Sequence, residues 1–179
     1  SLHQPVVGKD MTESIKKGGN VLIPAFAVGR TQDILYILNQ LTREGKLNRL
    51  QVFVDSPMAL QATRITLKHP ECLDKETLEL IKNDKFPKNG LSLKFTESVE
   101  ESMEINKIQS HAVIISASGM CEGGRIRHHL KHNLWRSECS VIFVGFQAVG
   151  TLGRRIVEGA KTVRIFGEEI AVKASIYTI

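Results

Sequence analysis

The chain has 179 residues, of which 42% are hydrophobic and 24% charged, a composition that excludes fibrous, disordered and membrane proteins and is typical of a soluble globular domain. Its net charge of +5 permits a polyanionic partner without requiring one. No stretch reaches the ~20 apolar residues of a membrane helix, and Cys72, Cys121 and Cys139 form no CxxC pair. A simple disulfide framework and a cysteine zinc site are therefore excluded, and a reducing, cytoplasmic setting is expected.

The predicted elements alternate between helix and strand along the chain. An opening helix over residues 7–17 is expected to end at the Gly18-Gly19 pair, as helices often do. Short, mostly apolar segments predict strands at 21–25, 51–55, 91–96, 112–116 and 140–144. Amphipathic segments predict helices at 31–43, 58–68, 75–83, 99–109, 125–135 and 152–159.

Strand followed by helix, repeated about five times, predicts parallel strands with right-handed crossovers. The expected fold class is α/β, a doubly wound and mainly parallel sheet with helices on both faces. Ser56 is expected to cap the third helix, with Pro57 at its first position, and residues 84–90 to form a surface loop. Residues 162–166, a turn from Gly167, and residues 170–179 predict a small C-terminal β appendage.

Both ends of the chain are abrupt. It opens at Ser1 and closes on the β-branched run from Ala174 to Ile179, with no turn or cap after it. We therefore expect residues 1–179 to be a single domain taken from a longer protein. A chain of this length can bury roughly 70% of its unfolded surface, which is enough for a full core.

Two of the loops expected at the carboxyl ends of the strands, where open α/β sheets bind ligands, carry charged residues. Gly29 and Arg30 precede a helix, where backbone amides and a guanidinium suit a phosphate or carboxylate; alternatively, Gly29 shapes a turn and Arg30 pairs on the surface. Asp55 and Ser56 follow another strand. Asp55 is expected either to orient a ligand or a neighbouring basic residue, or to share helix capping with Ser56.

The loop from Ser116 to Arg125, SASGMCEGGR, carries three glycines, two serines and an arginine before a helix. Glycines let backbone amides approach a ligand closely, and successive amides form an anion-binding nest; a long structural turn is the alternative. The sequence matches neither the dinucleotide fingerprint nor the Walker loop. A further candidate loop, Gly145 to Gly150, precedes the helix with Arg154 and Arg155.

The histidines give only a partial metal pattern. His128 and His132 have the spacing of a zinc helix, but His129 stands where a metalloprotease has Glu, and no other cluster supplies a third ligand. With Arg127 and Lys131 they are expected to form a basic, partly exposed helix face, either solvated or facing phosphate. One Trp and two Tyr argue against an aromatic platform for stacking bases.

Four segments together resemble the β-CASP domain, the cap of RNA nucleases with a metallo-β-lactamase fold. They are GGNVLIPAFAVGRTQ from Gly18, VDSPMA from Val54, SASGMCEGGR from Ser116 and GFQAVGTLG from Gly145. They follow one another in the family's order, and the resemblance covers nearly the whole chain.

This resemblance implies a two-domain zinc hydrolase that cleaves RNA phosphodiesters by metal-activated water, in a cleft between the cap and a catalytic domain. Two zinc ions would be held by that catalytic domain. The His-x-His-x-Asp-His zinc motif and the family's Glu-Ser-Thr-Tyr-Gly, Ser-Ala-His and His-Gly-Glu segments are absent from the 179 residues. The chain is therefore expected to carry no zinc ligand and to be inactive alone, with RNA and the metallo-β-lactamase domain as partners and no membrane; an oligomer is compatible with the sequence.

The resemblance also assigns residues to the cleft. Arg30 and Arg125 are the expected phosphate clamps. The full expected set is Arg30, Asp55, Ser56, Ser118, Gly119, Met120, Gly123, Gly124 and Arg125. Two other functions stay open: a stand-alone α/β module that binds a small phosphorylated or carboxylated ligand, and a non-catalytic interaction domain.

Overall fold

A computed structural model describes residues 4–47, 50–69, 71 and 92–179. The helix predicted at 75–83, the loop predicted at 84–90 and Cys72 lie outside the described residues. In chain order the elements are α1 (Gln4–Lys16), β1 (Val21–Pro24), α2 (Arg30–Arg43), β2 (Gln51–Asp55), α3 (Pro57–Lys68), β3 (Ser92–Thr96), α5 (Val99–Ile105), β4 (Ala112–Ser116), α6 (Ile126–Asn133), β5 (Ser140–Phe143), α7 (Leu152–Val157), β6 (Thr162–Ile165), β7 (Glu168–Ala171) and β8 (Ser175–Thr178).

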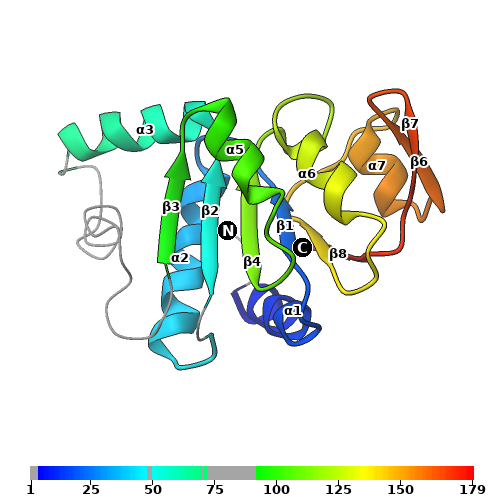
Figure 1. Cartoon of the computed structure of the whole chain (residues 1–179). Helices are drawn as coiled ribbons and strands as arrows, with labels where there is room; N and C mark the ends of the chain where they lie inside the picture. The colour runs from blue at the N-terminus through cyan, green and yellow to red at the C-terminus, as the bar shows by residue number, and fades with distance from the viewer. Residues whose placement is uncertain (1–3, 48–49, 70, 72–91) are drawn as a thin grey trace.

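Six of the strands form one sheet in the order β3-β2-β4-β1-β5-β8. Every neighbouring pair in it is parallel, so all six strands end at the same edge, where the arrowheads of β2 and β3 point upwards in Figure 1. The predicted α/β class with a mainly parallel sheet is confirmed. Among the described residues, no helix is both long and apolar enough to cross a membrane.

Apolar residues alternate between two cores because successive strand residues face opposite sides of a sheet. In β1, Val21 and Ile23 belong to one core and Leu22 to the other. The first core also takes residues from α1, α2 and α3, and the second from α5, α6 and α7. Helices therefore cover both faces of the sheet, as expected of a doubly wound fold (Figure 1).

The C-terminal region departs from the prediction in one respect. β6 and β7 form the expected antiparallel hairpin, but residues 170–179 are not a single strand. The backbone amides of Lys173 and Ala174 both donate to the carbonyl of Leu134, at 2.9 and 3.0 Å, which turns the chain back towards the sheet. β8 then pairs in parallel with β5, and Ile176 and Tyr177 pack against opposite cores.

Helix caps fix where the chain enters its helices at the carboxyl edge. Ser56 caps α3 as predicted, since its Oγ accepts a hydrogen bond from the amide of Ala59 at 3.2 Å, and Pro57 begins the helix. Ser98 and Glu101 form a reciprocal capping box at the start of α5. The predicted helix at 99–109 is shorter in the structure and ends at Ile105.

A polar cluster closes the opposite edge of the sheet. The Asn20 amide nitrogen donates to the carbonyl of Ile108 at 2.8 Å and to Oδ1 of Asn133 at 3.0 Å. Its oxygen accepts from the amide of Ala112 at 3.3 Å. Asn20 and Asn133 are both buried, so each satisfies polar groups that the core would otherwise leave unpaired.

Candidate functional site

The candidate site lies where β2, β4, β1 and β5 end. These four strands are neighbours, and the last residues of three of them are in register: Ser116 pairs with Pro24 on one side and Asp55 on the other. The loops that follow are therefore brought together at one edge, as the sequence predicted from the parallel topology.

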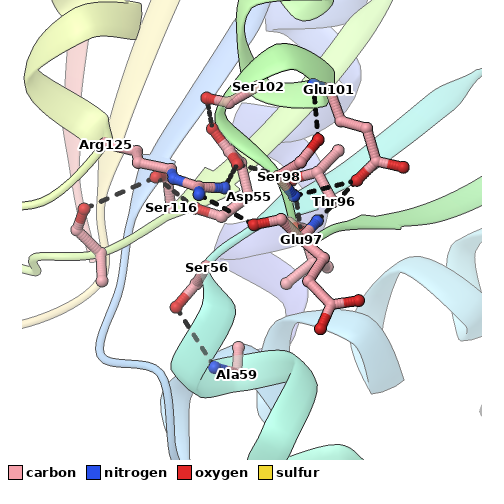
Figure 2. Close-up of polar contacts among 12 residues, drawn as sticks. Asp55, Ser56, Ala59, Thr96, Glu97, Ser98, Glu101, Ser102, Ser116 and Arg125 are labelled. Atoms are coloured by element: carbon pink, nitrogen blue, oxygen red, sulfur yellow. Dashed lines mark hydrogen bonds and ion pairs between the residues drawn. The ribbon is translucent and has the colours of Figure 1, made fainter.

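Asp55 is the centre of a buried polar cluster at this edge (Figure 2). Asp55 is 1% exposed, and its carboxylate accepts four hydrogen bonds, from β3, α5, α6 and the residue that precedes α6. Oδ1 accepts from Thr96 Oγ1 at 2.6 Å and Arg125 Nη1 at 2.8 Å. Oδ2 accepts from Ser102 Oγ at 2.5 Å and His129 Nε2 at 2.5 Å. Asp55 thus holds a basic residue of a neighbouring loop, one of the two roles expected for it, while Ser56 caps the helix.

Burial alone raises the pKa of the Asp55 carboxyl, but the hydrogen bonds from His129, Ser102, Thr96 and Arg125 outweigh it and hold that pKa well below its ordinary value. Asp55 is therefore ionised at neutral pH. Because a carboxylate only accepts hydrogen bonds, Nε2 of His129 carries the proton that it donates. Nδ1 of His129 is buried and has no hydrogen-bond partner among the described residues.

His129 was not among the predicted site residues, since it lies on a helix whose histidines were expected to form a basic, partly exposed face. His129 is 0% exposed, so that expectation is wrong for this residue, although His128 and His132 are exposed. The signal was present in the helix period: Ile126, His129, Leu130 and Asn133 are the buried residues of α6, at the i, i+3, i+4 and i+7 spacing of one helix face.

Arg125 is held on two sides. Besides its bond to Asp55, its Nη2 donates to the backbone carbonyl of Glu97 at 2.9 Å, and its side chain is 19% exposed. Arg30 is different: its side chain is 38% exposed and its nearest carboxylate, Asp33, lies 3.7 Å away. The two arginines expected as phosphate clamps therefore differ in how much of the guanidinium faces solvent.

The loop that leads to Arg125 is closed on itself by Ser118. The Ser118 amide donates to the carbonyl of Gly123 at 3.1 Å, and the Ser118 hydroxyl both donates to that carbonyl and accepts from the Gly123 amide, each at 3.2 Å. Gly124 has φ +75°, and a Cβ there would lie 2.3 Å from the carbonyl oxygen of Ala117. A Cβ at Gly123 would meet nothing within 4 Å.

A cavity of about 150 Å³ opens between the loops that follow β1, β4 and β5. Gln147 ties two of these loops together, since its Nε2 donates to the carbonyls of Gly119 at 2.9 Å and Gly145 at 3.1 Å. The cavity is lined by Pro24, Ala25, Phe26, Arg30, Gly119, Met120, Val144, Gly145, Phe146 and Gln147.

The predicted site residues thus divide into three groups. Arg30, Gly119 and Met120 line the cavity. Asp55 and Arg125 form the buried cluster beside it, and Ser56 caps α3. Ser118, Gly123 and Gly124 shape the loop between the two. The structure brings the nine residues to one edge of the sheet, but only the first group borders open space in the cavity.

The described residues offer no metal site. Within them, no three His, Cys, Asp or Glu side chains gather where they could hold an ion. Cys121 and Cys139 are buried and in no disulfide, and burial, followed by the nearby charge of Glu122, raises the pKa of the Cys121 thiol to about 12. This thiol is therefore protonated and unreactive at neutral pH.

Comparison with known proteins gives consistent matches. A family model described as the Beta-Casp domain matches residues 31–156. Ribonuclease TTHA0252 of Thermus thermophilus is 37% identical over 169 residues, 94% of this chain and 39% of the relative. The RNase J-like protein of Methanocaldococcus jannaschii is 33% identical over 171 residues (96% and 38%), and Transcription termination factor FttA of Methanosarcina mazei is 35% identical over 156 residues (87% and 24%). The chain thus spans about two fifths or less of these relatives.

Replacing Asp55 by Asn should lower the free energy of unfolding by about 3–5 kcal/mol at neutral pH, because Arg125 and the buried His129 lose their carboxylate. Since the folded-state pKa of Asp55 is lowered, its contribution is complete above the unfolded pKa of about 4 and is lost as the pH falls towards the folded value. Urea denaturation should therefore show the two proteins converging below about pH 4. Asp33→Asn, which breaks an exposed ion pair, is the control and should cost less than about 1 kcal/mol; equal losses in the two variants would contradict the role of Asp55.

Replacing Gly124 by Ala should destabilise the fold by about 2 kcal/mol or more, because the new Cβ meets the Ala117 carbonyl and φ is positive. The neighbouring Gly123→Ala, with open space around its Cβ, should stay within about 1 kcal/mol of the wild type. The unfolding temperatures of the two variants are compared by thermal denaturation monitored with circular dichroism. If the two variants melt together, the loop conformation described above is incorrect.

Proposed function

The chain belongs to the β-CASP family, and from that premise we propose that it is the RNA-binding cap of a zinc-dependent ribonuclease. RNA phosphodiester bonds are then hydrolysed in the cleft between this domain and a metallo-β-lactamase domain outside the 179 residues. The observation that carries the proposal is the 37% identity, over 94% of this chain, to a protein named a ribonuclease.

The described residues of this chain do not provide the ligands that the two zinc ions of the proposed enzyme need. Its described residues contain no cluster of three metal-ligating side chains, so we assign zinc to the other domain and no chemical step to this one. The proposed contribution of this chain is to bind and position RNA, and the chain alone is inactive.

Arg30 is the best candidate to bind an RNA phosphate. It stands at the start of α2, beside the cavity at the carboxyl edge, and its exposed guanidinium is only loosely paired with Asp33. A guanidinium recognises phosphate oxygens through two parallel hydrogen bonds. Exchanging the weak contact with Asp33 for a phosphate costs little, because exposed ion pairs contribute less than about 1 kcal/mol.

Arg125 serves the RNA path in another way. Its guanidinium is bound to Asp55 and to the carbonyl of Glu97, so contact with a phosphate would compete with a buried ion pair. We propose that Arg125 is a positioning residue that fixes the end of the Ser118–Gly124 loop, and that Gly119 and Met120 of this loop line the RNA path.

The proposal treats residues 1–179 as a single domain that folds by itself. Both faces of the sheet are covered by helices, and its two cores contain residues from β1 through β8. The purified chain is therefore a suitable protein for binding experiments.

The chain should bind short single-stranded RNA with an affinity that falls about tenfold or more between about 50 and 200 mM salt, because several phosphates release counterions. Replacing Arg30 by Gln should weaken binding to all sequences and reduce the salt slope by about one unit. The control, Arg164→Gln, removes the same charge from an exposed position of β6 and should leave the affinity and its salt slope unchanged. Fluorescence anisotropy measures the affinity and its salt slope. RNA binding that is insensitive to salt and to Arg30→Gln would instead favour a pocket for one small anion.

Labelled RNA incubated with the purified chain and zinc should remain intact, because the described residues provide no ligand set for the metal. A longer protein that includes the metallo-β-lactamase domain should cleave the same RNA and lose this activity with a chelator. Zinc-dependent cleavage by the 179-residue chain would overturn the assignment of an inactive cap.

A further inference from the structure

We propose that the cavity at the carboxyl edge binds one unpaired nucleobase of RNA, flanked by the rings of Phe26 and Phe146, with Arg30 on an adjoining phosphate. This inference rests on the proposed function, since it presupposes that the chain binds RNA. The new element is the part of the RNA that the cavity binds, a nucleobase.

Two exposed aromatic side chains border this cavity. Phe26 follows β1 and is 55% exposed, and Phe146 follows β5 and is 74% exposed. β1 and β5 are paired strands, and both side chains line the same cavity. The single Trp and two Tyr argue against an aromatic platform, but two phenylalanines, Phe26 and Phe146, line this cavity.

One edge of the Phe26 ring lies against Gly119. A Cβ at Gly119 would lie 3.4 Å from two carbon atoms of this ring, so the ring rests against the glycine backbone. Gly119 in turn is fixed by the hydrogen bond from Gln147, and Met120 by the amide of Gly153, which donates to its carbonyl at 3.0 Å. A wall that is already ordered loses little conformational entropy when a ligand binds.

The size of the cavity suits a single ring system. Its volume of about 150 Å³ is half or less of the ~300–1,000 Å³ of pockets that hold drug-sized ligands. It is therefore too small for a helix or strand of another protein, whereas a single base flanked by two rings needs no more than a shallow recess. Stacking also tolerates any base, since every base has a π face.

The charges at the cavity favour a nucleotide over an apolar protein surface. Among the described residues that line it, Arg30 is the one charged residue, and no carboxylate is present. An aromatic recess with one adjoining cation matches a base joined to a phosphate. Packing against another domain would also cover the two phenylalanines, but apolar packing would not explain the positive charge of Arg30 beside them.

The test compares RNA with an abasic oligonucleotide of the same length, whose backbone keeps the phosphates. The wild-type chain should bind the RNA about fivefold or more tightly than the abasic strand, and 2-aminopurine placed in the RNA should lose fluorescence on binding as it stacks. Phe146→Leu and Phe26→Leu should each weaken RNA binding about fivefold or more, leave binding of the abasic strand unchanged and reduce the quenching.

Two further variants serve as controls. Phe166→Leu changes another exposed phenylalanine, 44% exposed at the turn between β6 and β7, and should bind both strands as the wild type does. Arg30→Gln should weaken binding of both strands, because both carry phosphates. Since Phe26 and Phe146 are exposed, their variants should retain the wild-type unfolding temperature.

The outcomes separate this inference from the proposed function. If the wild-type chain binds RNA and the abasic strand equally and the phenylalanine variants change neither, the nucleobase site is overturned while RNA binding stands. If the phenylalanine variants lose only association with the metallo-β-lactamase domain, the rings form a protein contact and the inference is again overturned. If the chain binds neither strand, the proposed function fails as well.

Discussion

The buried carboxylate of Asp55 is the interaction on which the candidate site depends. It joins β2 to β3 through Thr96, to α5 through Ser102, and to the start of α6 through Arg125 and His129. Taking a carboxylate out of water is costly, and here its partners satisfy it and include an opposite charge. The same bonds hold Arg125 at the end of the Ser118–Gly124 loop, and two residues of this loop, Gly119 and Met120, line the neighbouring cavity.

Two arginines with similar local sequences, Arg30 and Arg125, differ in their partners and in their exposure. Gly29-Arg30 and Gly124-Arg125 each combine a glycine of positive φ with an arginine at the start of a helix. Arg125 has a buried acidic partner, whereas the ion pair that Arg30 makes with a described residue is the exposed one with Asp33, and Arg30 is the arginine that we propose to bind phosphate. What distinguishes them is the neighbouring strand, which the local sequence does not show.

Much of the fold was predictable because buried strands and amphipathic helices leave strong periodic signals; β2 and β4, for instance, have the predicted bounds. The place of β8 was not, because it depends on a turn fixed by the distant carbonyl of Leu134. Of the site, the sequence identified the loops but not the side chains that complete it. His129 lies on a helix face expected to be basic and partly exposed but is buried, and Phe26 and Phe146 stand in predicted loops without a role of their own. Only the assembled sheet brings these two phenylalanines to one cavity.

α6 is fastened at two points. His129 ties it to Asp55 at the carboxyl edge of the sheet, and Asn133, one turn later, ties it to Asn20 at the opposite edge. Asn133 also donates to the carbonyl of His129 at 2.8 Å. Because α6 makes these two buried contacts, a shift of the helix along its axis would break one cluster or the other. No residue of α6 lines the cavity, so if RNA binds there as proposed, we expect any adjustment in the Ser118–Gly124 loop and not in this helix.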